Sequence, residues 1–215
     1  MAANCDKPGG PEGRDGSEPA APFRNGWYAL ATQLRSPNFS PRSAELAITL
    51  AVLHSISLPP GEYGGHAIAS LFTNQLDWDA HPYFNSLRGL RVSAHFLIRR
   101  DGEVQQFVSC DERAWHAGKS CFQGRPNCND YSVGIELEGL EGQTFEVPQY
   151  DALVALLREL AAQYPIEHIA GHEHVAPDRK HDPGAGFDWA LLAHRLGWPP
   201  RCFPEGVANR RADSS

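Results

Sequence analysis

The sequence predicts an α/β protein in which a mixed central β-sheet is flanked by helices. A nearly continuous apolar run from Leu46 to His54 is typical of a strand that is buried on both faces. Apolar residues alternate from Tyr131 to Leu137, which indicates a second strand. Helical spacing of apolar residues from Pro148 to Tyr164 indicates a long helix that ends before Pro165. Strands that alternate with helices and hairpins favour helices packed on both faces of one sheet.

The two ends of the chain differ in composition from its middle. Residues 1–22 are rich in Gly, Pro, Asp and Glu, so we expect a disordered N-terminal arm. Residues 199–215 resemble the arm, and we expect a flexible C-terminal tail whose Phe203 is able to dock on the core. A chain of 215 residues fits one domain, which we place at 23–198.

The shorter elements follow from turn signals. The dipeptide Asp101-Gly102 supplies the positive φ that a hairpin turn requires, so we expect two antiparallel strands around it. The remaining expected elements are strands at 92–98, 103–108 and 166–170, short helices at 67–71 and 82–87, and a last helix at 187–196 that stops at Gly197.

Composition narrows the class of protein. The net charge is −7, with 19 basic and 26 acidic residues, which disfavours a nucleic-acid partner. No apolar run approaches a membrane span, and the first residues show no signal peptide, so we expect a cytoplasmic protein without a membrane partner. The five cysteines form no C-x-x-C pair, which argues against a disulfide framework and a thiolate zinc site. Cys121 and Cys128 are close enough to bridge, but we expect reduced thiols.

The segment from Gly171 to Gly184, GHEHVAPDRKHDPG, carries the strongest chemical signal. Imidazole nitrogens and a carboxylate oxygen are ligands that zinc accepts, and a catalytic zinc takes three of them. The candidates here are His172, His174 and His181, with Asp182 as the expected oxygen donor. The alternative is a solvated, histidine-rich surface loop.

A second histidine extends this hypothesis to another strand. His54 ends the first buried strand and His172 follows the strand at 166–170. If these strands are neighbours, both imidazoles emerge at the same sheet edge, where α/β folds place their sites. The alternative for His54 alone is a hydrogen bond to a loop carbonyl.

Other polar residues have both a functional and a structural interpretation. Glu136 is a candidate general base on the same strand face as Glu138, or else an exposed glutamate paired with a lysine. Lys180 is able to face an oxyanion, or is a solvated loop residue. His95 fits a buried structural histidine, while His116 contacts substrate or packs against its neighbour Trp115.

Five motifs together resemble a known family. They are LHSISLPPGEYGG, LRVSAHFLIRRDGEVQQFV, RAWHAGKS, CNDYSVGIELEG and GHEHVAPDRKHDPGAGFDW, and the resemblance runs from Gly26 to Trp198. In order and spacing they resemble the zinc-dependent N-acetylmuramoyl-L-alanine amidases of type 2. Within that family they are most similar to the cytoplasmic enzymes that cleave 1,6-anhydro-N-acetylmuramyl peptides.

The resemblance implies a function and a set of site residues. It implies a type 2 amidase fold, related to peptidoglycan-recognition domains, that hydrolyses the amide between (1,6-anhydro-)N-acetylmuramic acid and L-alanine in cell-wall recycling. The anhydromuropeptide would be the partner of a monomeric enzyme. In this sequence, the resemblance implies zinc ligands at His54, His172 and Asp182, catalytic roles for Glu136 and Lys180, and substrate contacts at Arg91 and Trp115.

Three positions depart from the family pattern. His174 stands where an aspartate is usual, His181 replaces a threonine, and Ser55 replaces an asparagine. The extra imidazoles would compete as ligands or tune the site, and Ser55 puts one substrate hydrogen bond in doubt. One rival function is a catalytically silent peptidoglycan-fragment binding module, which would be expected to lack one of the three metal-binding residues. A second rival is an exported amidase that acts on intact cell wall. The absence of a signal-peptide pattern argues against this second rival.

Overall fold

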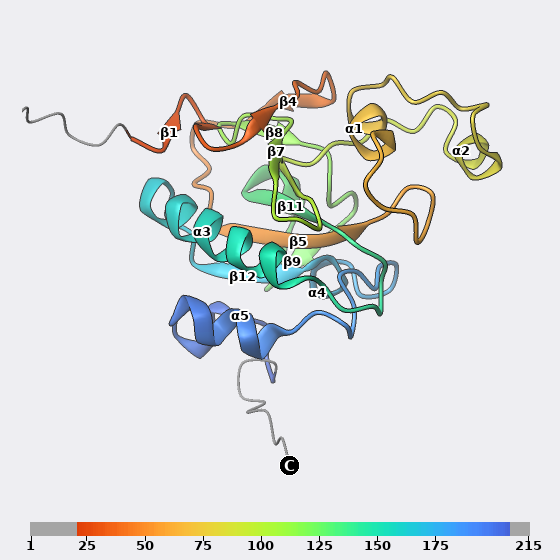
Figure 1. Ribbon diagram of the computed structural model, residues 1–215. Helices are drawn as coiled ribbons and strands as arrows, with labels where there is room; N and C mark the ends of the chain where they lie inside the picture. The colour runs from red at the N-terminus through yellow and green to blue at the C-terminus, as the bar shows by residue number, and fades with distance from the viewer. Residues whose placement is uncertain (1–20, 207–215) are drawn as a thin grey trace, which may run out of the picture.

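The computed structural model describes residues 21–206 and contains a six-stranded mixed sheet (Figure 1). The first four strands are parallel to one another, the fifth pairs with the fourth in an antiparallel hairpin, and the sixth runs parallel to the fifth. In spatial order the strands are β12 (His168–Gly171), β5 (Leu50–Ile56), β11 (Ser132–Glu138), β6 (Phe96–Ile98), β7 (Val104–Gln106) and β3 (Thr32–Gln33). This sheet and its flanking helices confirm the predicted fold class.

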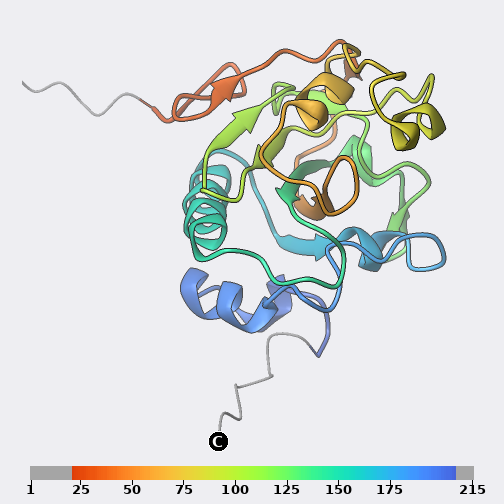
Figure 2. The same ribbon diagram turned by 45° about the vertical axis from the view of Figure 1, so that its right-hand side comes forward.

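Helices cover both faces of this sheet (Figures 1 and 2). On one face lie α3 (Val147–Gln163) and α5 (Trp189–Leu196), whose buried side chains share a core with Phe96 and Ile98 of β6. On the other face α1 (Ala67–Phe72) and α2 (Pro82–Ser86) pack on Leu97. Side chains alternate along β6, so this strand contributes to two separate hydrophobic cores, one on each face of the sheet. The remaining helices are α4 (His172–Val175) and the 3₁₀ turns η1 (Cys128–Asp130) and η2 (Pro200–Cys202).

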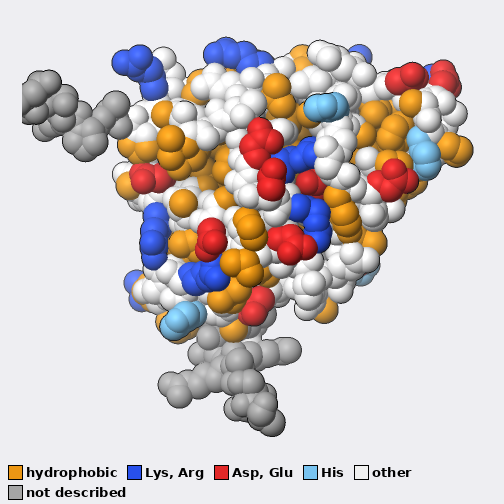
Figure 3. Space-filling model, in the orientation of Figure 1, with side chains coloured by type: hydrophobic (Ala, Val, Ile, Leu, Met, Phe, Trp, Pro, Cys, Tyr) orange, Lys and Arg blue, Asp and Glu red, His pale blue; other side chains and the backbone are white. Residues whose placement is uncertain are grey.

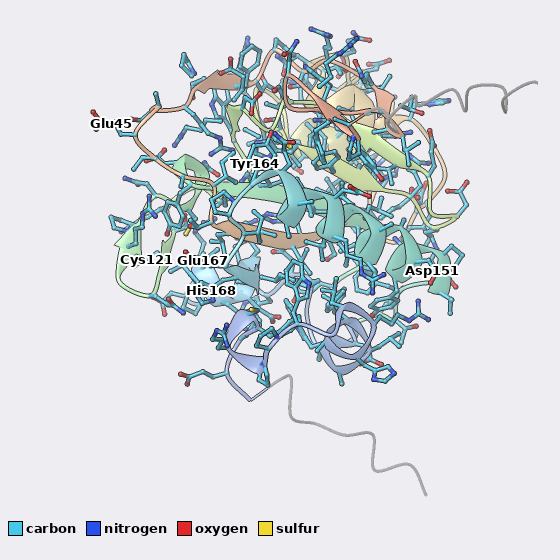
Figure 4. The ribbon with its side chains drawn as sticks, turned by 90° about the vertical axis from the view of Figure 1, so that its left-hand side faces the viewer. Glu45, Cys121, Asp151, Tyr164, Glu167 and His168 are labelled. Atoms are coloured by element: carbon cyan, nitrogen blue, oxygen red, sulfur yellow. The ribbon has the colours of Figure 1, made fainter. Side chains whose placement is uncertain are left out.

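The long helix α3 forms most of the larger core. Leu153, Leu156, Leu157 and Leu160 are fully buried and meet the apolar face of β11. At its N-terminus, Gln149 donates hydrogen bonds to the carbonyls of Ile98 and Glu138, which fixes the helix to two strand ends. Figure 4 shows Asp151 and Tyr164 near opposite ends of this helix.

Short strand pairs were not predicted. They are β1 (Phe23–Arg24) with β2 (Trp27–Tyr28), β4 (Phe39–Pro41) with β8 (Glu112–Ala114), and β9 (Cys121–Phe122) with β10 (Arg125–Pro126). Ladders of two or three residues are too short to show a period of two in sequence. The pairs β1–β2 and β9–β10 are local hairpins, whereas β4 and β8 lie far apart in the sequence.

Several element boundaries differ from the predictions. β5 begins at Leu50 rather than Leu46 and continues to Ile56, so His54 lies within the strand and not at its end. β6 begins at Phe96, because the residues before it bond to a loop, as in the bond from the Ser93 amide to the Trp115 carbonyl. The final helix starts at Trp189 and stops at Gly197, whose φ of 69° is the expected left-handed cap.

The chain ends are described only in part. Phe203 follows η2 and is buried in the larger core. Residues 1–20 and 207–215 lie outside the described range, so the arm at 1–22, the domain at 23–198 and the tail at 199–215 remain predictions.

Surface and thiol features of the described range complete the fold. No helix within residues 21–206 is long and apolar enough to cross a membrane. The four cysteines of that range, including Cys121 and Cys128, are free, and Cys5 lies outside it. Acidic and basic side chains are interspersed on the face shown in Figure 3.

Candidate metal centre

Three side chains converge at the carboxyl ends of the parallel strands. The Nδ1 atoms of His54 and His172 are 2.9 Å apart, and each lies 3.2 Å from Oδ2 of Asp182. Within the described residues these are the only three His, Cys, Asp or Glu side chains grouped closely enough to hold a metal ion. Both histidines are almost fully buried, and Asp182 is partly exposed.

Neighbouring strands explain this convergence. β12 pairs directly with β5 in parallel register, so the two histidines reach the same edge of the sheet, as predicted. His172 is the first residue of α4, immediately after β12. The loop that carries Asp182 is held by a hydrogen bond from the Glu173 amide to the Asp182 carbonyl.

The donor set fits a divalent cation such as zinc. Ligand atoms around a tetrahedral zinc, with bonds of about 2.0–2.1 Å, lie roughly 3.3 Å apart, close to the separations seen here. Burial lowers the pKa of His54 to about 4, so its imidazole is neutral at pH 7 and offers a lone pair. Burial alone would raise the pKa of Asp182, but hydrogen bonds with His172 and His54 outweigh burial and lower that pKa. An ionised carboxylate and the neutral imidazole of His54 are therefore available beside the His172 ring.

Glu136 lies beside this cluster. It is the direct partner of His54 in the parallel register of β11 and β5, so the two side chains lie on the same face of the sheet. Its Oε2 atom is buried without a hydrogen-bond partner among the described residues. Burial raises the pKa of Glu136 well above its usual value, Asp182 raises it further, and Lys180 opposes them. The expectation of an exposed glutamate is thus wrong, because the side chain is 9% exposed.

Glu138, two residues further along β11, has a different environment. It is buried and pairs with Arg99, with 3.2 Å between Oε2 and Nε. It also accepts hydrogen bonds from the amides of Gly64 and Arg100, so it anchors the loop after β5. The partner is an arginine and not the lysine that the sequence suggested.

Lys180 is half-buried next to Asp182. Its positive charge lowers the pKa of both His54 and Glu136, which places the ammonium group within electrostatic reach of the cluster. The Lys180 amide donates to the carbonyl of Ala176, at the end of α4.

The two expected substrate residues lie outside the cluster. Arg91 is exposed in the segment before β6, and Trp115 is half-buried. The Trp115 indole donates to Oγ of Ser40, and its amide donates to Oγ of Ser93. Neither side chain touches the three candidate ligands, and their substrate roles remain predictions.

The two additional histidines of the loop do not join the cluster. Nδ1 of His174 accepts a hydrogen bond from the Gly171 amide, and its ring packs edge-on against Trp189. His181 is exposed. Both departures from the family pattern therefore leave the ligand set unchanged.

His116 is the site residue whose place sequence reasoning missed. Its Nδ1 lies 3.0 Å from Nε2 of His54, on the side of that ring away from the cluster. His95 is fully buried, as predicted, and its Nδ1 accepts from the Gly134 amide. The sequence signal for His116 was its place in the Trp115–Gly118 motif, which does not reveal the partner.

Comparisons with known proteins identify the family of this chain. The profile of the N-acetylmuramoyl-L-alanine amidase family matches residues 44–185. The 1,6-anhydro-N-acetylmuramyl-L-alanine amidase AmpD of Salmonella typhimurium (strain SL1344) is 52% identical over 179 residues, which cover 79% of this chain and 96% of the relative.

Two solved structures are also similar. The crystal structure of a selenomethionine derivative of AmpD has a TM-score of 0.79 and 49% identity, and the match covers 81% of this chain and 98% of that one. A complex of the amidase AmiD from E. coli with anhydro-N-acetylmuramic acid-L-Ala-D-γ-Glu-L-Lys has a TM-score of 0.51 and 31% identity, covering 72% of this chain and 60% of that one. The chain therefore belongs to the N-acetylmuramoyl-L-alanine amidase family and is an amidase.

Proposed function

We propose that this enzyme is a zinc-dependent amidase of peptidoglycan fragments. It would hydrolyse the bond between the lactyl group of (1,6-anhydro-)N-acetylmuramic acid and L-alanine, in cell-wall recycling. The observation that carries the proposal is the convergence of His54, His172 and Asp182 beside the buried, unpartnered carboxyl oxygen of Glu136. The Salmonella relative is named as a 1,6-anhydro-N-acetylmuramyl-L-alanine amidase, and the AmiD complex contains an anhydro-N-acetylmuramic acid peptide. Both names support this choice of substrate.

His54, His172 and Asp182 would hold the zinc ion. Bound there, zinc supplies a Lewis acid that polarises the scissile carbonyl and lowers the pKa of a water molecule. Histidines bind zinc as neutral imidazoles and aspartate binds it as a carboxylate, so the ligand set would carry one negative charge and the loaded site would stay cationic. A cationic site attracts the carboxylate-rich stem peptide of the substrate.

Glu136 would act as the general base. Its carboxylate takes a proton from the water that attacks the lactyl carbonyl carbon, and then gives that proton to the L-alanine nitrogen as the C–N bond breaks. Burial suits this role, because it raises the affinity of the carboxylate for a proton. The unpartnered Oε2 atom has no competing hydrogen bond from the described residues.

Lys180 would stabilise the negative charge that develops on the carbonyl oxygen. Its charge acts on His54 and Glu136, and its backbone amide bonds to the Ala176 carbonyl at the end of α4. A preorganised cation in a partly buried site interacts more strongly with an oxyanion than it would in bulk water. Arg91 and Trp115 would contact the substrate, with the Arg91 guanidinium pairing with a stem-peptide carboxylate.

The proposal includes a cytoplasmic, monomeric enzyme without membrane or nucleic-acid partners. The four free cysteines of the described range are compatible with a reducing compartment. Cell fractionation and light scattering of the purified protein would test compartment and oligomeric state.

The first test is metal content, measured by elemental analysis in parallel with cleavage of anhydromuramyl tripeptide. The samples are wild type, His54→Ala, His172→Ala and Asp182→Ala, with His174→Ala as the matched control from the same loop. One zinc per chain is expected in wild type and in the control, and it should be lost together with activity in the other three.

Each other outcome changes the proposal in a defined way. Zinc without cleavage in the wild type would favour a silent binding module. Loss of zinc from His174→Ala would mean that this imidazole, which binds the Gly171 amide in the structure, is a ligand instead.

A further inference from the structure

His116 contacts His54, one of the candidate zinc ligands, at the ring nitrogen that points away from the cluster. Its Nδ1 lies 3.0 Å from Nε2 of His54, and the two rings meet edge-on at an angle of 85° with centroids 5.1 Å apart. Its other nitrogen, Nε2, lies 3.2 Å from Oγ of Ser132. The Ser132 hydroxyl donates to the Cys128 carbonyl at 2.6 Å. The ring of His116 is thus held at both nitrogens.

The hydrogens of this chain have one consistent direction. Nδ1 of His54 faces the metal cluster, so its hydrogen lies on Nε2 and donates to Nδ1 of His116. His116 then carries its own hydrogen on Nε2 and donates to Ser132, whose hydroxyl hydrogen goes to Cys128. These tautomers follow from the partners, and every donor finds an acceptor.

Ala117, the residue after His116, contacts the other candidate histidine ligand, His172. Nε2 of His172 lies 3.3 Å from the carbonyl oxygen of Ala117, so that ligand also has an acceptor at its outer nitrogen. The Arg179 guanidinium donates to the same carbonyl at 2.8 Å. Oδ1 of Asn129 accepts from the amides of both His116 and Ala117. One fixed dipeptide therefore orients two ligands that come from different elements.

The sheet leaves a space for the His116 ring. Gly134 lies in β11, and a Cβ atom built there would be 2.4 Å from Cγ of His116. A separation below 3.0 Å does not occur between packed atoms, so only glycine permits the ring to lie against the strand. The same strand carries Glu136, which ties the position of this ring to that of the proposed base.

We propose that His116 is a positioning residue for the metal centre, which holds His54 in the tautomer and orientation that present Nδ1 to the ion. This inference rests on the proposed zinc function and goes beyond its ligand set. It adds to the two sequence interpretations of His116, because the ring contacts the candidate ligand His54. Partners of this kind raise metal affinity, and their loss typically costs roughly 10–100-fold.

A matched pair of variants tests the role. His116→Leu fills the space without an acceptor, whereas His116→Asn places Oδ1 close to the position of Nδ1 and restores one. Zinc affinity, measured by competition with a chromophoric chelator, should fall roughly 10–100-fold in His116→Leu and stay within about threefold of wild type in His116→Asn. A purely space-filling role predicts no rescue by asparagine, which is smaller than leucine.

Imidazole nitrogen shifts from NMR of the zinc-loaded wild type give a second measurement that needs no variant. They should show the hydrogen of His54 on Nε2 and that of His116 on Nε2. A His116 hydrogen on Nδ1 would overturn the proposal even if His116→Leu failed to fold. Equal zinc affinity of wild type and a folded His116→Leu would also overturn it.

The proposed function fails separately from this inference. A wild type that binds no zinc contradicts the metal site itself. Zinc bound by His54, His172 and Asp182 but indifferent to His116 contradicts only the positioning role.

Discussion

The histidines of this protein differ in what their ring nitrogens contact. His54 and His172 turn Nδ1 towards each other and towards Asp182. His95 accepts a backbone hydrogen bond in the core, and His174 accepts one at the start of α4. The neighbours of each ring, and not its position in a motif, decide whether it is a ligand or a structural group.

Replacing Glu136 tests the general base. Glu136→Gln keeps the shape of the side chain but cannot take a proton, so we expect kcat to fall by roughly a hundredfold or more with zinc content unchanged. Steady-state cleavage of anhydromuramyl tripeptide and elemental analysis would measure both. Turnover near the wild-type value would refute the assigned role, and loss of zinc would assign Glu136 to the metal.

Lys180 is expected to act on the transition state and not on substrate binding. Lys180→Met keeps much of the aliphatic stem and removes the charge, so kcat should fall by roughly a hundredfold or more while KM changes little. Lys119→Met is a suitable comparison, because Lys119 is an exposed lysine whose side chain lies outside the cluster. A rise in KM with unchanged kcat would contradict a transition-state role.

His95 gives a pH dependence to the stability of the protein. Burial lowers its pKa to about 3 from 6.5, so the folded state keeps His95 neutral while the unfolded state takes up a proton below pH 6.5. The contribution of neutral His95 to the free energy of unfolding is complete above pH 6.5. As the pH falls from 6.5 towards 3, this contribution decreases by about 1.4 kcal/mol per pH unit.

The variant His95→Asn keeps an acceptor for the Gly134 amide without a group that titrates in this range. Its free energy of unfolding, measured by urea denaturation between pH 7 and 4, should decline less steeply with falling pH than that of wild type. Identical slopes would show that His95 does not carry this dependence.

The proximity of the three candidate ligands was predictable where chemistry and place in the chain coincided. His54, His172 and Asp182 were predicted from ligand type, strand ends and the family motifs, and the structure brings them together. The contact between His116 and His54 was not predictable, because it spans 62 positions and joins a loop to a strand. Nothing in local periodicity encodes such a pairing.

At the scale of elements, β11 connects the fold to the site. One face of the strand packs on α3 through Val133, Ile135 and Leu137, and the other carries Gly134 and Glu136. The alternation predicted from the sequence is confirmed. The sequence did not predict that both faces are buried, because the second face is covered by loops whose placement depends on the folded whole.

Adding one methyl group to β11 should therefore damage both stability and metal binding. Gly134→Ala would force the His116 ring away, and such overpacking typically costs about 1–3 kcal/mol. Gly65→Ala is the matched control, because open space surrounds its Cβ position. Urea denaturation and zinc titration would measure the two effects, and a Gly134→Ala protein equal to its control would contradict this packing argument.

At the scale of the whole molecule, the metal site joins parts of the chain that are far apart in sequence. Its three candidate ligands come from β5, from the start of α4 and from the loop that precedes α5. The sequence predicted the layer order and the principal helices, since these follow from long periodic segments. The short strand pairs were not predicted, because strands of two or three residues show no periodicity in the sequence.

Removing zinc should lower the thermal stability of the entire domain. At a free zinc concentration of about 100 times Kd, binding stabilises the folded state by about 2.7 kcal/mol, which corresponds to roughly 5–10 °C in Tm for a protein of this size. Scanning calorimetry before and after chelation would measure the shift. In His172→Ala the chelator should have no effect, and an equal shift there would point to a different metal site.

The pairing of β5 with β11 sets His54 opposite Glu136, and it does so residue for residue from Ser132 with Leu50 to Glu138 with Ile56. Side chains alternate between the faces of a strand, so a single-residue insertion between Ser132 and Glu136 would turn the carboxylate into the apolar layer beneath α3. An insertion of two would restore the face but displace Glu136 along the strand by about 6.6 Å. The distance between Glu136 and the candidate metal ligands is thus set by the alignment of the two strand backbones. An insertion or deletion in β11 would therefore displace the carboxylate from the candidate site.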